Sequence, residues 1–154
     1  MVHAEASAEL NAPAETVYRI IADYRTRHPR IIPPRYLRNL TVDAGGYGDG
    51  TLIRYDAIAF GRTRHVRARV TEPEPGRVLL ESDLDLALVT TFTVDPLDGA
   101  RSRLTIATDM PTHAGLAGWL ERLLIRAYFK RAYAEELTLV RAETARETPH
   151  EAAH

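Results

Sequence analysis

One long amphipathic segment near the C-terminus constrains this chain more than any other feature. Residues 111–113 (Pro-Thr-His) open it, and apolar side chains recur at helical spacing over residues 116–137. A stripe of this length needs a large concave partner, because a helix alone cannot bury an apolar face. At ~100° per residue the stripe consists of Leu116, Trp119, Leu120, Leu123, Ala127, Ala134 and Leu137.

The preceding residues predict that partner. Seven segments have strand-like patterns, and short polar turns such as residues 73–76 (Pro-Glu-Pro-Gly) separate most of them. Residues 13–24 predict a short helix, and residues 25–35, limited by prolines, predict a second short helix or an irregular segment. We therefore expect an α+β fold, in which a curved seven-stranded antiparallel sheet wraps the long C-terminal helix, with two short helices after the first strand. The expected strands are residues 2–10, 37–42, 51–59, 63–72, 77–83, 86–94 and 103–109.

Length and composition favour a single globular domain. The chain has 154 residues, 45% of them apolar. We expect the domain to span residues 1–143. Residues 144–154 are polar and contain a proline, so we expect a disordered tail there.

Charge and cysteine content exclude several classes of protein. The net charge of −1 provides no overall attraction to nucleic acid or to an anionic membrane. Without cysteine the chain has no disulfide, no thiolate metal site and no cysteine nucleophile. No signal peptide is recognisable, and no apolar run has the length of a bilayer. We expect a cytoplasmic protein without integral membrane association, nucleic-acid partner, metal or cofactor.

Five motifs carry a resemblance to a known superfamily. They are Asn-Ala-Pro-Ala-Glu-Thr-Val-Tyr (11–18), Ala-Asp-Tyr (22–24), His-Pro-Arg-Ile-Ile-Pro-Pro (28–34), Gly-Gly-Tyr-Gly-Asp-Gly-Thr (45–51) and Val-Thr-Glu-Pro-Glu-Pro-Gly-Arg (70–77). Over residues 2–142 the chain resembles the SRPBCC or START-like superfamily, and more closely its polyketide cyclase/dehydrase-type bacterial members. The resemblance implies a helix-grip fold with an apolar cavity between sheet and helix. Because the superfamily includes lipid carriers, hormone receptors and cyclases, it does not select one function.

In the strand expected over residues 63–72, apolar and polar residues alternate, and this alternation predicts which side chains form the cavity wall. If Val66 points inward, the inner face is mostly apolar with a few hydroxyls, which is typical of a small-molecule pocket; a core filled by side chains is the alternative. Glu81 and Asp83 then fall on the outer face, beside Arg67 and Arg69, so no strand carboxylate or histidine faces inward. The residues expected to contact a ligand are Tyr24, His28, Tyr36, Tyr55, Ser82, Thr90, Phe92, Thr108, Met110, Leu116, Trp119, Leu120, Leu123 and Lys130.

Two single residues and one loop have alternative interpretations. His28 is either a hydrogen-bonded loop histidine or a base near the cavity mouth. Lys130 projects onto the apolar stripe, where it is either a buried amine or an extended side chain that reaches water. The glycine-rich residues 45–50 predict a flexible hairpin at the cavity rim, because the sequence lacks the ending of a phosphate-binding loop.

Three functions follow as hypotheses. The first is the binding of a hydrophobic or amphipathic small molecule, such as a lipid, a polyketide or an aromatic compound. The second is a polyketide cyclase/dehydratase-like enzyme acting on carbonyl substrates, with His28 or a buried carboxylate as base. The third is a protein-interaction module, which an exposed apolar patch would indicate. The sequence leaves a homodimer open.

Overall fold

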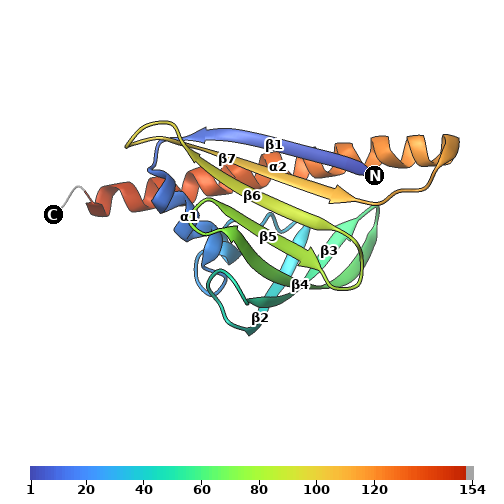
Figure 1. The fold of residues 1–154 in the computed structure, drawn as a ribbon, viewed down its shortest axis with the longest axis horizontal. Coiled ribbons are helices and arrows are strands. Elements are labelled where there is room, and N and C mark those ends of the chain that lie inside the picture. Colours follow the sequence, from blue (N-terminus) through green and yellow to red (C-terminus); the bar gives the residue numbers. More distant parts are fainter. Residues whose placement is uncertain (152–154) are drawn as a thin grey trace.

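A seven-stranded antiparallel sheet and one long helix form the framework (Figure 1). The computed structural model describes residues 1–151 and their side chains as far as residue 147. The strand order is β1-β7-β6-β5-β4-β3-β2, so every neighbour in the chain from β2 onward is also a neighbour in the sheet. The elements are β1 (Val2–Leu10), α1 (Ala14–Ala22), η1 (His28–Arg30), β2 (Leu37–Ala44), β3 (Leu52–Ala59), β4 (Arg62–Glu74), β5 (Val78–Asp83), β6 (Val89–Pro96), β7 (Ser102–Met110) and α2 (Gly115–Glu151).

This architecture confirms the helix-grip fold expected from the sequence. β1 pairs with β7 along its whole length, and α2 packs chiefly on β1. The two short helices, α1 and η1, cover the sheet near the second half of α2 (Figure 1). The apolar core lies between these helices and the sheet, where Ile20, Ile21, Leu104 and Val140 are fully buried. The first half of α2 extends beyond this core.

A β-bulge in the β4–β5 hairpin reverses the expected face of β5. Val70 pairs with Glu81, whereas Glu74 pairs with Val78, so the register shifts by one residue between Thr71 and Glu74. A shift of one residue exchanges the two faces of a strand. Glu81 therefore shares the inner face with Val70. The expectation that Glu81 and Asp83 lie outside, and that Ser82 faces the cavity, is wrong.

The face of α2 that meets the sheet also differs from the expected one. Leu116, Trp119, Leu120 and Leu123 are each more than half exposed, and Lys130 is exposed. The cavity is instead met by residues from the opposite side of the helix, namely Ile125, Tyr128, Phe129, Ala132, Tyr133 and Glu136. The first half of α2 is apolar on both sides, so periodicity alone cannot choose the buried one.

The C-terminal residues continue the helix. α2 runs to Glu151, so residues 144–151, which we expected to be disordered, are helical. Glu143 and Thr144 are buried. Arg30 contacts the Glu143 carboxylate at 3.2 Å and so links η1 to α2. Residues 152–154, the rest of the expected tail, lie outside the described residues.

The glycine-rich loop packs against α1, and the structure does not place it at the cavity rim. The backbone N–H of Gly48 donates to the carbonyl of Ala22 at 3.0 Å, and that of Tyr24 donates to Gly46 at 2.9 Å. Gly48 has φ +60°, and a Cβ there would lie 1.8 Å from Oε1 of Glu72. The loop thus fixes the segment that carries Tyr24, and it requires glycine to do so.

We expect the Gly48→Ala variant to be less stable than Gly76→Ala. Both glycines have positive φ, but a Cβ at Gly76 meets nothing within 4 Å. Gly76→Ala should lower the free energy of unfolding by about 1 kcal/mol through backbone strain. Gly48→Ala should cost more, because the Glu72 carboxylate has to move and lose its hydrogen bonds from the Tyr18 hydroxyl and the Asp49 N–H, each worth ~1 kcal/mol. Urea unfolding monitored by circular dichroism measures both, and equal losses would contradict the proposed packing of the loop.

Candidate functional site

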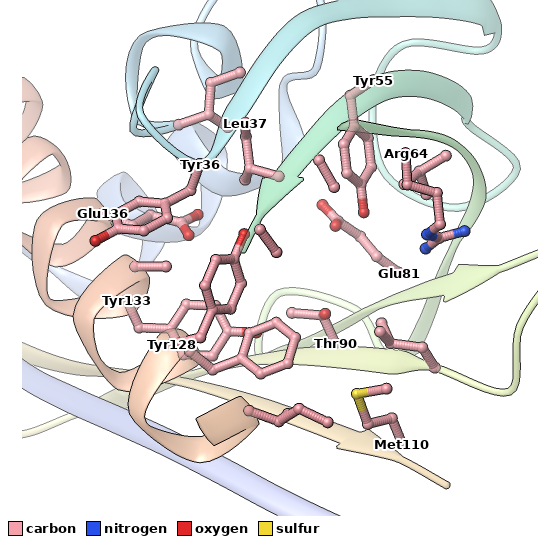
Figure 2. A pocket seen from close by; sticks show the side chains of 18 of the residues that line it. Tyr36, Leu37, Tyr55, Arg64, Glu81, Thr90, Met110, Tyr128, Tyr133 and Glu136 are labelled. Carbon is pink, nitrogen blue, oxygen red and sulfur yellow. The ribbon is translucent and has the colours of Figure 1, made fainter. Parts of the chain in front are cut away.

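A cavity of about 410 Å³ lies between the inner face of the sheet and α2 (Figure 2). This volume falls in the range of small-molecule sites, and most of the lining side chains are apolar or aromatic. Tyr128 closes one side, because its hydroxyl donates to the carbonyl of Ile58 on β3 at 2.7 Å. The exposed ring of Phe60 lies beside Tyr128, with the ring centroids 5.8 Å apart.

The structure brings together about half of the residues that the sequence nominated for ligand contact. Six of them line the cavity: His28, Tyr36, Tyr55, Thr90, Phe92 and Met110. Tyr24 and Thr108 are buried directly behind this wall, through contacts to His28 and Thr90 respectively. Six others lie elsewhere, as β5 and α2 present different faces: Ser82, Leu116, Trp119, Leu120, Leu123 and Lys130.

A buried carboxylate from β5 organises the polar part of the wall. The Glu81 side chain accepts a hydrogen bond from the Tyr24 hydroxyl at 2.5 Å, and Nε2 of His28 lies 3.5 Å from the same oxygen. Figure 2 shows the carboxyl group of Glu81 pointing toward the Tyr55 hydroxyl. Burial, and next the charge of Glu81, raise the pKa of the phenols of Tyr24 and Tyr55. Both phenols therefore stay protonated and can donate hydrogen bonds.

The orientation of His28 fixes where its proton lies. Nδ1 is 2.7 Å from the carbonyl oxygen of Ile21, which can only accept, so Nδ1 carries the hydrogen. In a neutral ring Nε2 is then a bare acceptor that faces Glu81. Nε2 lies 3.5 Å from Oε1 of Glu81 and makes no hydrogen bond among the described residues, so it remains available as an acceptor. Burial lowers the pKa of His28, against the opposing effect of the Glu81 charge.

The ring of His28 is held rigidly. It stacks on Tyr24, with centroids 4.2 Å apart and planes 18° apart, and meets the edge of Phe92 at 5.7 Å. Only 3% of the residue is exposed. Of the two alternatives for this residue, the structure shows a hydrogen-bonded histidine whose second nitrogen faces a carboxylate in the cavity wall.

A second carboxyl group, that of Glu136, enters the cavity from α2. The residue is 3% exposed, and its carboxyl makes no hydrogen bond with the described part of the chain. Burial, and next the charge of Glu81, raise the pKa of Glu136 well above its ordinary value. A carboxyl in this state is a neutral hydrogen-bond donor that a ligand can use.

Hydroxyl groups and two arginines, Arg62 and Arg64, complete the polar lining. Thr90, which is opposite Glu81 in the sheet, bonds Thr108 at 3.0 Å, and Thr108 contacts the Tyr133 hydroxyl on α2. Arg64 reaches the cavity from β4 and pairs with the buried carboxylate of Asp83. The cavity thus has an apolar body, with polar groups contributed by both the sheet and α2. No group of three or more metal-ligating side chains gathers within the described residues.

Glu81 and Glu136 are the two functional residues that sequence reasoning missed. The two prolines in residues 73–76 are the only signal for Glu81, because they favour an irregular hairpin in which the register can shift. Glu136 follows another glutamate, Glu135, and the pattern does not distinguish them until the buried face of α2 is known. The structure leaves the Glu135 side chain 43% exposed, 3.7 Å from Arg35.

Comparison with known proteins agrees with the fold and the cavity. The family model described as "Polyketide cyclase / dehydrase and lipid transport" matches residues 1–144, so the chain belongs to this family. The chain also shares its fold with a solved START superfamily protein. A search of curated proteins finds no match.

Solved structures with the same fold belong to proteins that are described in different ways. The solution structure of the KanY protein has a TM-score of 0.81 and 26% identity, and the match covers 94% of this chain and 97% of that one. The Zhui aromatase/cyclase from Streptomyces sp. R1128 has a TM-score of 0.77, 22% identity and coverages of 95% and 94%. A START superfamily protein from Mycobacterium smegmatis has a TM-score of 0.73, 15% identity and coverages of 94% and 97%.

We expect Glu136→Gln to stabilise the protein increasingly as the pH rises above about 4.5, the ordinary value for glutamate. Above that pH the unfolded chain loses the Glu136 proton while the folded chain retains it. The folded state then binds more protons, so its stability falls with rising pH, by up to ~1.4 kcal/mol per pH unit. Glutamine removes this loss.

Urea unfolding of the wild type and the variant at pH 5, 6, 7 and 8 measures the effect. Glu135→Gln is the matched control, because its carboxylate is largely exposed. A difference between wild type and Glu136→Gln that does not grow with pH would show that Glu136 is ionised in the folded protein.

Proposed function

We propose that this protein binds a hydrophobic or amphipathic small molecule, of the lipid, polyketide or aromatic class, in the cavity between sheet and α2. The observation that carries the proposal is the cavity itself, about 410 Å³ with a mainly apolar lining and a few polar groups. Apolar burial provides affinity in such a site, and a few polar groups provide orientation. The family description, which includes lipid transport, supports this class of ligand.

The polar groups define how the ligand would lie. The neutral Glu136 carboxyl can donate a hydrogen bond and has no partner in the described chain. The protonated hydroxyl of Tyr55, beside Glu81, is a second donor. A ligand with a carbonyl or hydroxyl group satisfies these groups, whereas a pure hydrocarbon leaves them unpaired. An unpaired buried polar group costs ~1–3 kcal/mol. We therefore infer that the ligand places an oxygen-containing group beside Glu136 and Tyr55, and an apolar body toward Phe60 and Met110.

Filling the cavity should abolish binding without unfolding the protein. Ala57 lines the cavity from β3, whereas Ala87 is exposed between β5 and β6. We expect Ala57→Phe to weaken ligand affinity at least tenfold, and Ala87→Phe to leave it unchanged. Native mass spectrometry and thermal shift with a panel of fatty acids, polyketides and flat aromatic ketones measure this. A panel in which no compound binds the wild type would refute the proposal.

A second function, cyclase- or dehydratase-like catalysis on carbonyl substrates, is favoured by one specific arrangement. Nε2 of His28 is an acceptor 3.5 Å from the Glu81 carboxyl group at the cavity wall, and Glu136 offers a neutral donor for a carbonyl oxygen. Proton removal next to a carbonyl needs a base at the carbon and a donor at the oxygen. The aromatase/cyclase fold relatives are compatible with such chemistry in this family.

Proton transfer can be tested before the substrate is known. We expect the wild type to accelerate deuterium exchange at the carbon next to the carbonyl of 4-phenylbutan-2-one in D₂O, followed by NMR. Glu81→Gln and His28→Phe should each reduce this acceleration about 100-fold or more. Glu135→Gln should not change it. If the ketone binds the wild type but exchanges deuterium only at the uncatalysed rate, the catalytic proposal is refuted and binding remains the proposed function.

A further inference from the structure

The first half of α2 exposes an apolar face that the fold does not cover. We call Leu116, Trp119, Leu120, Leu123 and Leu124 the outer α2 face; their exposed fractions are 87%, 55%, 53%, 51% and 49%. Single exposed apolar residues are ordinary, but five large ones on consecutive turns form a continuous patch, which marks an interaction site. Figure 1 shows this half of α2, in orange, extending beyond the ends of β1 and β7.

The outer α2 face lies opposite the cavity. At ~100° per residue, its residues project to one side of the helix, and the cavity-lining residues Ile125, Tyr128 and Phe129 project to the other. The cavity explains why the inner side of the helix is apolar. It does not explain why the outer side is apolar, so the outer side calls for a different binding partner.

The charges beside this face favour an anionic surface. Residues 115–131 contain four basic residues, Arg122, Arg126, Lys130 and Arg131, and one acidic residue, Glu121. Within the described chain, the last three basic residues form no ion pair; Arg126 contacts only the carbonyl of His3. Several arginines on the sheet do form ion pairs, such as Arg67 with Asp85. The overall charge of −1 hides this local excess of positive charge.

A second copy of this chain fits the patch less well than a lipid surface does. Two copies joined through the outer α2 face would bring like basic groups together, which is unfavourable. Leucine and tryptophan beside arginine and lysine are typical of helices that lie in the plane of an anionic membrane. The turns that carry Leu123 and Leu124 also carry Ile125 and Tyr128, so this contact would place the cavity wall next to the lipid.

We propose that the outer α2 face docks the protein on an anionic lipid bilayer. The leucines and Trp119 enter the interface between headgroups and acyl chains, while Arg126, Lys130 and Arg131 contact the lipid phosphates. Docking of this kind is peripheral, because no helix among the described residues has the length and apolarity to cross a membrane. The proposal concerns a different surface from the ligand cavity and stands independently of it.

Trp119 reports directly on this contact, because it is the only tryptophan in the chain. We expect its fluorescence to shift to shorter wavelength with vesicles of phosphatidylcholine and phosphatidylglycerol, and the protein to float with them. Vesicles of phosphatidylcholine alone should bind less. Leu120→Ser/Leu123→Ser should abolish binding, and Arg126→Glu/Lys130→Glu should weaken it roughly 30-fold or more, since each basic residue contributes ~1 kcal/mol.

Leu97→Ser is the matched control, since Leu97 is also exposed but lies in the turn between β6 and β7. It should leave vesicle binding unchanged, and circular dichroism checks that every variant is folded. Failure of the wild type to bind either vesicle overturns the proposal, as does binding that persists in Leu120→Ser/Leu123→Ser. A dimer in analytical ultracentrifugation that the same substitutions dissociate would assign the face to a second copy instead.

Discussion

The contact between Tyr24 and Glu81 is the interaction on which the site depends. It joins the segment after α1 to the middle of the sheet, over a hydrogen bond of 2.5 Å that is buried from solvent. Each partner is placed by a local irregularity in the backbone. The glycine-rich loop holds Tyr24 through the carbonyl of Gly46, and the bulge in β4 turns Glu81 inward. A carboxylate inside an apolar core is costly unless it is hydrogen-bonded, so these irregularities and the contact support one another.

The cavity combines an apolar body with polar groups, two of which are carboxyl groups that differ in environment. Glu81 is held by Tyr24 and faces His28, whereas Glu136 has no hydrogen-bond partner in the described chain. Pairs of titratable groups in different environments are a common arrangement for acid–base chemistry, and they also serve to orient an oxygen-bearing ligand. Family membership and fold relatives are compatible with both uses. The geometry supports binding first, because the whole cavity lining suits an apolar ligand with an oxygen function, whereas only His28, Glu81 and Glu136 suggest a reaction.

The long helix has two functions along its length. Its second half closes the core, where Leu137 and Val140 are buried. Its first half contributes Ile125, Tyr128 and Phe129 to the cavity and exposes leucines and Trp119 on the other side. The cavity and the sheet cover only one side of this half, and an exposed apolar side of this size marks an interaction surface.

Local sequence patterns are sufficient for the element order, the antiparallel sheet, the helix-grip fold and part of the strand-derived cavity wall. These features follow from local periodicity and from turns, which a single chain displays directly. Only the tertiary structure decided that Glu81 faces inward, since one bulged residue exchanges the faces of β5. Only the tertiary structure decided which side of α2 meets the sheet, because both sides of its first half are apolar. The long helix that opened the sequence argument is thus confirmed as the element that the sheet grips, while the stripe expected to lie in that grip belongs, over residues 116–124, to the outer surface.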